Sequence, residues 1–432
     1  MIVGQDAAER VRGVAGDLAS YLGRIGGAEF ATQVGDGREG ITVGMARDFP
    51  ALELEKVLEV KGIADREAYV LKSHARGLYV VGATELAVEH AVWDLLYRLG
   101  YRQFFPGRVW EVIPEKKTLS IAVDALERPD YLNRRIWYGF GLWDYNREPY
   151  DEWCSRNRTA SAFELNISHA YEGIIRRNKS TFDAHREFMG LLDGERKSSK
   201  LCIGNPDLRE LVVNYAIKCF EDDPGRDSIS MDPSDGGGWC ECEECAALGS
   251  ITDRALTLAN QVAEALNSEF DDKYVGMYAY NYHSPPPSVR VHPNVIISIA
   301  TSFIKGGYSL DELITGWSRQ GATIGMREYY AVFPWDHDLP GQARGSNLAY
   351  LQRTIPEFHG KGARFMSAES SDNWGCNGLG YYVASRILWD IDEAGNVEDM
   401  VADFLEKAFG PAQETMARFY ELIDGAGKPP LC

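Results

Sequence analysis

The sequence lacks any apolar run of about 18 residues, the length that a membrane-spanning helix needs. It also begins, at Met1-Ile-Val-Gly-Gln-Asp, without the basic region and long apolar stretch of a signal peptide. We therefore expect no membrane contact and no targeting segment in this chain, and both a cytoplasmic and a secreted or periplasmic location stay open. Cysteine is not abundant, at eight in 432 residues, and a chain of this size does not need disulfides to hold its core.

Positive charge is in deficit, with 45 basic against 64 acidic residues and a net charge of −19. Such a surface repels a polyanion, so a nucleic acid is not an expected partner. Aromatic residues make up 11% of the chain, with 10 Trp and 22 Tyr. Because aromatic rings stack on the apolar faces of sugars and also fill protein cores, the composition fits a sugar-binding cleft and an aromatic-rich core equally well.

The first 125 residues have the pattern of a compact α/β domain. Residues 5–24 have the apolar spacing of an amphipathic helix, and residues 41–44, 69–72 and 77–82 have that of short strands. A second helix is predicted from Thr84, a suitable N-cap, to Leu99, ahead of Gly100. We assign residues 1–125 to this domain and residues 126–432 to a second one.

From residue 133 on, short β-rich runs alternate with helical stretches. Eight runs begin at residues 135, 162, 200, 228, 274, 295, 323 and 363, with helices predicted at 206–220, 253–270 and 347–359. Eight strands with intervening helices over about 300 residues are typical of a closed (β/α)8 or TIM barrel. An open doubly wound sheet is the alternative, but no GxGxxG or Walker motif supports a nucleotide-binding form of it. The predicted fold class is α/β, a TIM barrel preceded by a small α/β domain.

In barrel enzymes the reacting groups lie at the carboxyl ends of the strands, and here carboxylates follow several predicted strands. Glu328 and Glu369 each directly follow an apolar run, and Asp235 follows the fourth run. Cleavage of a glycosidic bond needs a carboxylic acid that protonates the leaving oxygen, and a second carboxylate or the substrate's own N-acetyl group. These three are the predicted catalytic residues, with a salt bridge to Arg327 or Arg364 as the alternative role.

Further polar and aromatic residues at the strand ends are predicted to bind the sugar. They are Tyr138, Trp143, His169, Asp232, Trp239, Tyr280, Asn281, Tyr282, Tyr329, Trp335, His337 and Trp374. His169 fits a sugar-binding role and a role as a hydrogen-bonded core histidine equally well. Glu328 and Glu369 end consecutive strands, which lie about 4.8 Å apart in a sheet, so we expect their carboxyl groups to face one cleft about 5–9 Å apart, the range that glycosidases use.

Three cysteines follow the fourth predicted strand in the pattern Cys240-Glu-Cys-Glu-Glu-Cys245. With a fourth ligand from elsewhere, three thiols can bind zinc, but no second CxxC or HxxxH motif completes a standard set. The pattern therefore favours a tight loop with reduced thiols or with one local disulfide. We expect no catalytic metal and no cofactor.

Four stretches of the chain are similar to known domains. Residues 73–84, Ser-His-Ala-Arg-Gly-Leu-Tyr-Val-Val-Gly-Ala-Thr, and residues 90–107 resemble the α/β domain that precedes the barrel in family 20 hexosaminidases and family 67 α-glucuronidases. Residues 230–245, which include Asp-Gly-Gly-Gly-Trp-Cys-Glu-Cys-Glu-Glu-Cys, and residues 381–390 resemble the DUF4838 barrel domain. That domain includes glycoside hydrolase family 163, endo-β-N-acetylglucosaminidases that act on N-glycans, so the resemblance implies a glycoside hydrolase. Family 20 enzymes carry an adjacent Asp-Glu pair after strand four, where this chain has Asp232-Pro-Ser-Asp235, so that mechanism does not transfer.

Three functions remain open from the sequence. The first is a retaining β-glycosidase that cuts at an N-acetylhexosamine, and the number of strand-end carboxylates favours such an enzyme over a barrel without catalytic activity. The second is an α-glucuronidase-like exo-enzyme, which needs a cation such as Arg327 or Arg135 for the sugar carboxylate. The third is a barrel that binds glycans without cleaving them. In each case the expected partner is an oligosaccharide or glycan, while sugar identity, linkage and oligomeric state are not fixed by the sequence.

Overall fold

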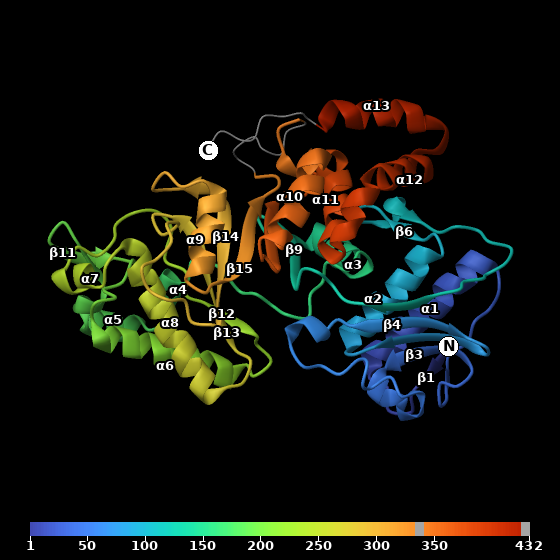
Figure 1. Ribbon diagram of the computed structural model, residues 1–432, viewed down its shortest axis with the longest axis horizontal. Helices are drawn as coiled ribbons and strands as arrows, with labels where there is room; N and C mark the ends of the chain where they lie inside the picture. Colours follow the sequence, from blue (N-terminus) through green and yellow to red (C-terminus); the bar gives the residue numbers. More distant parts are fainter. Residues whose placement is uncertain (333–340, 425–432) are drawn as a thin grey trace. The chain divides into compact units, whose positions relative to one another are not determined.

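The computed structural model describes residues 1–332 and 341–424 (Figure 1). The chain forms two compact units: the first contains Met1–Phe163, Tyr330–His359 and the chain from Glu369 on, and the second contains Glu164–Tyr329 and Gly360–Ala368. The boundary that we predicted between residues 125 and 126 lies within the first unit and stays a prediction. None of the described helices combines the length and the apolar character that a membrane span requires.

A six-stranded sheet forms the N-terminal part of the first unit. Its order is β2-β1-β3-β5-β4-β8, in which β1, β2, β3 and β5 run parallel and β4 is antiparallel to β5 and β8. The strands are β1 (Ile2–Val3), β2 (Gln33–Val34), β3 (Gly40–Met45), β4 (Tyr69–His74), β5 (Gly77–Gly82) and β8 (Asp124–Glu127). The three strands predicted in this part of the sequence are confirmed.

Helices α1 (Glu9–Gly26) and α2 (Glu85–Arg98) pack on one face of this sheet (Figure 1). Successive residues of a strand point to opposite faces, so Leu71 joins the core under the two helices while Val70 joins a smaller core on the other face. Burial of both faces explains why these strands read as unbroken apolar runs. Thr84 caps α2, because its hydroxyl accepts a hydrogen bond from the backbone N–H of Ala87 at 3.2 Å. Both predicted helices are confirmed.

The second sheet has six strands, in the order β12-β13-β14-β15-β16-β9. They are β9 (Asn133–Tyr138), β12 (Ser228–Ser230), β13 (Tyr274–Asn281), β14 (Val295–Ile304), β15 (Thr323–Tyr329) and β16 (Phe365–Ser370). Strands β12 to β15 are parallel, and the sheet curls like half of a TIM barrel. The predicted fold class is confirmed, but the expectation of a closed eight-stranded barrel is wrong for the described residues.

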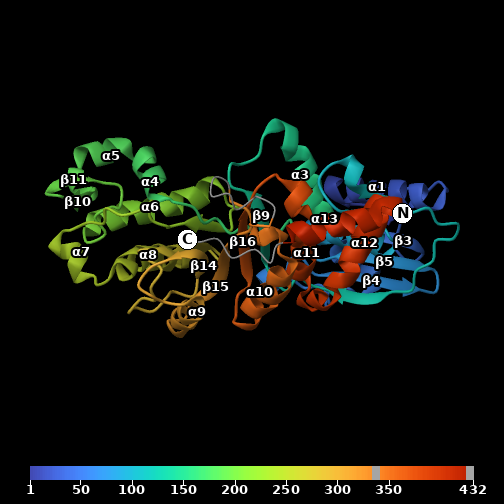
Figure 2. The same ribbon diagram turned by 90° about the horizontal axis from the view of Figure 1, so that it is seen from above.

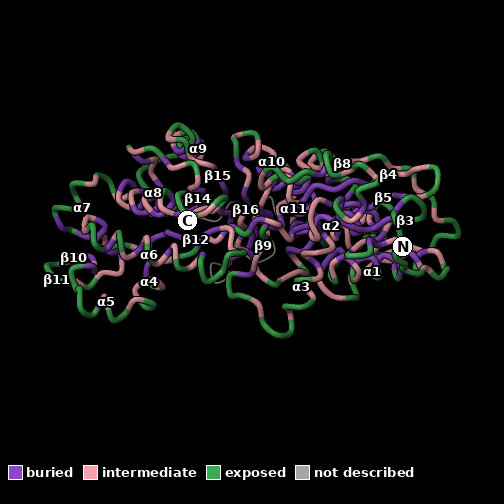
Figure 3. The backbone as a smooth tube through the Cα atoms, turned by 90° about the horizontal axis from the view of Figure 1, so that it is seen from below, coloured by how far each residue is buried: buried purple, intermediate pink, exposed green. Residues whose placement is uncertain are grey.

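Helices cover the strands of the second unit, as a barrel-like order requires. α8 (Ile251–Glu269) packs on β13 and β14, α9 (Leu310–Arg319) packs on β14 and β15, and α6 (Pro206–Asp222) lies beside α8 (Figure 2). The first unit carries α3 (Asp144–Arg156), α10 (Leu348–Gly360), α11 (Trp374–Trp389), α12 (Val397–Phe409) and α13 (Gln413–Ile423). The helices predicted at 206–220, 253–270 and 347–359 are confirmed. β13 and β14 are buried along most of their length, whereas the short strands β10 and β11 lie in a part of the unit with many exposed residues (Figure 3).

One predicted strand, residues 162–167, runs beside β12 without forming a regular ladder. The backbone N–H groups of Asn166 and Ser168 donate to the hydroxyls of Ser228 and Ser230, at 2.7 and 3.1 Å, instead of to backbone carbonyls. The Ser230 hydroxyl in turn donates to the Ser168 carbonyl at 2.6 Å. The segment is therefore extended and paired, but through serine side chains.

The other missing strand, residues 200–203, is not extended. Leu201 has a φ of 52°, in the left-handed region, which breaks an extended run. Lys200 donates from Nζ to the carbonyl oxygen of Ser234, and the Cys202 sulfur lies 3.5 Å from that of Cys242. Side-chain contacts to the loop after β12 thus shape this segment.

Candidate functional site

A fully buried carboxylate, Asp232, lies just beyond the end of β12 in the second unit. Its Oδ1 accepts from the backbone N–H of Tyr278 at 2.9 Å and lies 3.2 Å from Nε2 of His283, and its Oδ2 lies 3.0 Å from Nδ1 of His169. These partners replace the water that burial removes. Burial opposes the charge, but the two histidine contacts outweigh it and lower the pKa of Asp232. Asp232 is therefore ionised and anchors both rings.

His169 is the accessible member of this group, with 40% of its side chain exposed. Its Nδ1 lies 3.0 Å from Asp232 and 2.8 Å from the carbonyl oxygen of Pro233, so two acceptors fix a proton on this nitrogen. Burial opposes the imidazolium, but the Asp232 carboxylate outweighs it and raises the pKa of His169. The exposure favours a ligand-binding role over that of a core histidine, and this role stays a prediction.

Tyr280 and Asp235 lie close to His169. The Tyr280 ring centroid is 6.0 Å from that of His169, and burial together with the nearby Asp235 carboxylate raises the pKa of Tyr280 to about 12. Asp235 is exposed, and its Oδ1 accepts from the backbone N–H of Gly236 at 2.7 Å. At the end of β13, Asn281 takes a left-handed φ of 50° and the next ring, Tyr282, is exposed. Four predicted residues, Asp232, His169, Tyr280 and Asp235, are therefore brought together.

Lys200 belongs to the same region and was missed from the sequence. Its buried Nζ donates to the Ser234 carbonyl and lies 4.8 Å from the ring centroid of Trp239, one of the predicted sugar-binding residues. Burial lowers the pKa of Lys200 to about 8, against the opposing effect of Asp232 and Asp235. The signal in the sequence is a lysine at the head of the apolar run Lys200-Leu-Cys-Ile, for which the pattern predicts a strand.

Glu328 lies near the end of β15 and is 1% exposed. Its Oε2 accepts from the Thr301 hydroxyl at 2.9 Å and from the backbone N–H of Tyr329 at 3.1 Å. The Tyr329 ring is also buried, with the guanidinium carbon of Arg327 4.7 Å from its centroid. The Glu328 carboxyl is thus held in a fixed position by neighbours on β14 and β15, as a catalytic group must be. Its catalytic role stays a prediction.

Glu369, near the end of β16, lines a cavity of about 340 Å³ in the first unit and is half-buried. The other residues of the cavity wall are Tyr138, Gly139, Phe140, Gly141, Trp143, Val332, Ser370, Ser371 and Asp372. A Cβ atom on Gly139 would overlap the Glu369 carboxylate, so the glycine leaves room for it beside β9. Trp143 is 56% exposed and presents an aromatic ring to the cavity that a sugar can stack on.

Trp374 supports the wall of the Glu369 cavity. Its Nε1 donates to the Tyr138 hydroxyl at 2.6 Å, and its ring centroid lies 4.7 Å from that of Trp153. Burial raises the pKa of Tyr138. At the rim, the exposed Asp372 accepts from the Tyr145 hydroxyl at 2.7 Å. The hydrogen bond of Trp374 makes it a positioning residue for Tyr138, and its predicted contact with sugar stays a prediction.

Two predicted sugar-binding residues, Trp335 and His337, lie outside the described residues. Glu328 and Glu369 belong to different compact units, so each is described with its own neighbours. The expectation that the two carboxyl groups face one cleft stays a prediction.

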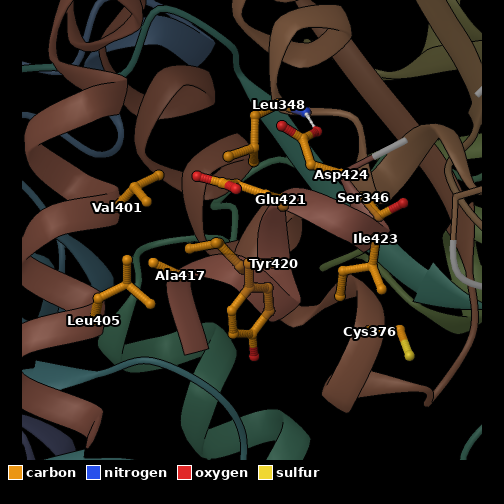
Figure 4. Close-up of a pocket in the computed structure, with 12 residues that line it drawn as sticks. Ser346, Leu348, Cys376, Val401, Leu405, Ala417, Tyr420, Glu421, Ile423 and Asp424 are labelled. Atoms are coloured by element: carbon orange, nitrogen blue, oxygen red, sulfur yellow. Dashed lines mark hydrogen bonds between the residues drawn. The ribbon is translucent and has the colours of Figure 1, made fainter. Parts of the chain in front are cut away.

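A second pocket in the first unit has a more aliphatic wall than the Glu369 cavity (Figure 4). It lies among α10, α11, α12 and α13, and aliphatic side chains such as Leu348, Val401 and Leu405 make up much of its wall. The backbone N–H of Leu348 donates to the Asp424 carboxylate at 2.8 Å at one side. None of the predicted site residues lines this pocket, so the Glu369 cavity is the stronger candidate for sugar chemistry.

Four cysteines meet in the second unit, where the sequence had suggested three. Cys202 joins Cys240, Cys242 and Cys245, all four are buried, and their sulfur atoms all lie within 4.8 Å of one another. No disulfide occurs among the cysteines of the described residues, so a local disulfide, one of the two structures favoured from the sequence, is wrong. The sequence does not point to Cys202, because it is remote from the other three cysteines and lies in a run that the apolar pattern predicts as a strand.

A half-barrel with carboxylates and aromatic rings at its strand ends is the class of protein that these observations define. The chain belongs to the DUF4838 family, described as a domain of unknown function, whose model matches residues 105–421. The resemblance to this family is therefore confirmed. No protein with curated annotation matches the chain.

The solved structures that share the fold include two carbohydrate-active enzymes. A family 115 4-O-methyl-α-glucuronidase with specificity for decorated arabinogalactans has 12% sequence identity and a TM-score of 0.60, over 97% of this chain and 60% of that one. A family 138 enzyme that targets the pectin rhamnogalacturonan II has 10% identity and a TM-score of 0.53, over 95% of this chain and 55% of that one. This chain therefore spans less than two thirds of the length of either enzyme, and the likeness is one of fold.

Proposed function

We propose that the protein is a glycoside hydrolase that cleaves a glycosidic bond in a complex glycan. The observation that carries this proposal is the half-buried carboxyl of Glu369 in a cavity that also presents the exposed ring of Trp143. A carboxyl in this position can reach a glycosidic oxygen and donate its proton to the leaving group, while the ring stacks on the sugar. The fold shared with two glycoside hydrolases supports the proposal.

A second carboxylate completes the chemistry in this proposal. Glu328 is our candidate, because Thr301 and the backbone of Tyr329 hold its carboxylate in place. In a retaining enzyme this group attacks the anomeric carbon, and in an inverting enzyme it activates a water molecule. Asp235, which is exposed after β12 and lies near Tyr280, is the third candidate.

An acidic sugar is the substrate that we favour. The observation behind this choice is the half-exposed His169, which Asp232 holds in place and whose pKa is raised, so that its ring can bind a sugar carboxylate as an imidazolium. The glucuronidase among the similar structures supports the choice. Cleavage at an N-acetylhexosamine rests on the resemblance to family 163 alone, and the two similar structures are described as acting on arabinogalactan and pectin.

The test is a screen of the full chain against arabinogalactan, rhamnogalacturonan II, glucuronoxylan, glycosaminoglycan fragments and N-glycans, with the released sugars separated by anion-exchange chromatography. Release of free uronic acid identifies the exo-acting enzyme that we favour, and release of N-acetylated products identifies the alternative. Glu369→Gln and Glu328→Gln are each expected to lower kcat by about 100-fold or more. The matched control is Glu210→Gln, an exposed position on α6, which should keep the wild-type rate.

Two results contradict the proposal. If both variants keep near-native rates on every substrate that the wild type cleaves, the chemistry lies elsewhere, and Asp232 and Asp235 become the next pair to replace. If calorimetry shows glycan binding while no product forms from any bound glycan, the protein is a carbohydrate-binding half-barrel and not a hydrolase.

A further inference from the structure

We infer that Cys202, Cys240, Cys242 and Cys245 bind one zinc-class metal ion as a closed, structural site. The Cys202 and Cys242 sulfurs lie 3.5 Å apart, those of Cys240 and Cys242 lie 3.4 Å apart, and those of Cys245 and Cys202 lie 4.0 Å apart. Zn–S bonds of about 2.3 Å in a tetrahedron place the sulfurs about 3.8 Å from one another. The observed separations match such a shell and are far longer than the roughly 2.05 Å of a disulfide.

Backbone N–H groups point at the sulfurs, as they do around metal-bound thiolates. The N–H groups of Leu191, Gly204 and Cys245 donate to the sulfurs of Cys240, Cys245 and Cys242, at 3.3, 3.2 and 3.4 Å respectively. A neutral thiol is a weak acceptor, whereas a thiolate is charged and accepts strongly. Three such donors around one cluster therefore fit thiolates, and thiolates buried this close together need a cation between them.

The residues around the four cysteines also offset the negative charge of the thiolates and let the backbone come close to the sulfurs. Four thiolates around a divalent ion leave two negative charges, and the Arg196 guanidinium lies 3.9 Å from the Cys240 sulfur. Gly204 has no room for a Cβ atom, which would overlap the backbone at Cys245. Only a glycine lets the backbone of this segment come near enough to donate to the Cys245 sulfur.

The sulfur spacing also selects the kind of metal. Tetrahedral four-sulfur sites hold zinc or belong to iron–sulfur clusters. In a cluster the thiolates bind different iron atoms, which spreads the cysteine sulfurs more widely than the shell of a single ion. All four sulfurs here lie within 4.8 Å of one another, which fits a single ion. Four protein ligands leave no open position for a substrate, so the role is structural and not catalytic.

The metal would tie together two segments that the sequence keeps apart. Cys202 follows the hairpin of β10 (Gly190–Leu192) and β11 (Glu195–Ser198), while the other three cysteines lie in the loop after β12 and in the short helix α7 (Glu243–Ala247). The same loop carries Asp235 and Trp239, two of the predicted site residues. A metal at this place fixes the carboxyl-terminal end of this loop to the segment that carries Cys202, and the inference holds whether or not the protein cleaves a glycan.

The test uses the untagged full chain, produced in zinc-supplemented medium and purified under reducing conditions without chelator. Elemental analysis should find about one zinc per chain in the wild type. Cys202→Ser should lower zinc at least tenfold, whereas the control Cys219→Ser, a half-buried cysteine of α6, should keep it. If Cys202→Ser does not fold, the wild type serves instead, because a mercurial reagent should release its zinc stoichiometrically to a chromogenic chelator. Cobalt substitution should give the visible spectrum of tetrahedral thiolate coordination.

Three outcomes would overturn the inference. The first is wild-type protein that contains less than about one zinc in ten chains, because a buried four-thiolate site binds zinc tightly enough to stay occupied through purification. The second is Cys202→Ser protein that holds as much zinc as Cys219→Ser. The third is an intact mass that is short by two hydrogens for each cysteine pair, because that mass shows disulfides in place of thiolates.

Discussion

Replacing Asp232 by asparagine removes the charge that holds His169 and His283. Asparagine has a single acceptor oxygen for the three donors around Asp232, which are His169, His283 and the Tyr278 N–H. Its amide N–H group then faces one of these donors. A hydrogen bond to a charged group contributes about 1.5–3 kcal/mol, and the share of His169 is reduced because its side chain is 40% exposed. We therefore expect Asp232→Asn to cost about 2–4 kcal/mol, most of it from the buried contacts with His283 and the Tyr278 N–H. For a cooperative unit of 150–250 residues this lowers the melting temperature by about 4–16 °C.

The pH dependence gives the sharper test of this prediction. The lowered pKa of Asp232 means that its contribution is present above the unfolded value of about 3.9 and is lost as pH falls through the folded value. The raised pKa of His169 means that its contribution is complete below the unfolded value of about 6.5 and is lost as pH rises through the folded value. The pair thus stabilises most between about pH 4 and pH 6.5.

Melting curves of wild type and Asp232→Asn at pH 5.5 and pH 8.5 measure this difference, and NMR titration of His169 measures its pKa directly. The destabilisation should be larger at pH 5.5, and the pKa of His169 should fall in the variant. Asp235→Asn, an exposed carboxylate of the same loop, is the control and should change the melting temperature little. An equal or larger effect at pH 8.5, or an unchanged pKa of His169, would refute the reasoning.

Two further predictions concern the first unit. Gly139→Ala should displace the Glu369 carboxylate and lower kcat by about 10- to 100-fold. The free energy of unfolding should change by less than about 1 kcal/mol, because the added Cβ meets the end of a side chain. Gly173→Ala, which has open space around it, is the control, and wild-type turnover of Gly139→Ala would count against a role for Glu369. Thr84→Ala should destabilise the protein by about 1 kcal/mol in urea unfolding, because α2 loses its N-cap, whereas Thr84→Ser should restore the stability, and equal stability of the two variants would contradict the cap.

The sequence allowed most of the fold to be predicted, because regular strands and helices carry a periodic apolar signal. The same signal predicted a strand at 162–167, where the chain is extended but bonds to the hydroxyls of Ser228 and Ser230. No local pattern distinguishes a carbonyl from a hydroxyl as the acceptor on a neighbouring segment. At 200–203 the apolar run was misread, because the left-handed turn at Leu201 depends on tertiary contacts of Lys200 and Cys202.

The candidate site was predicted in part for a related reason. The strand-end rule identified His169, Asp232, Tyr280 and Asp235, because the ends of neighbouring parallel strands meet at one edge of a sheet. Lys200 lay outside that rule, because it stands at the head of the predicted run 200–203 and not after the end of a predicted strand. Partnerships between remote residues, such as the anchoring of His169 by Asp232, depend on the folded chain and carry no spacing signal in the sequence.

The serine hydroxyls along β12 also bear on solubility. β12 is the last strand at its end of the sheet, and such a strand ordinarily leaves a row of unpaired backbone groups that can recruit a strand of another molecule and start aggregation. Here the segment that follows residue 162 covers the edge strand β12 through contacts with the hydroxyls of Ser228 and Ser230. The Ala170 N–H of the same segment also donates to the Asp232 carbonyl at 2.9 Å. The protein can therefore keep an open sheet of six strands without exposing the edge at β12 to a second molecule.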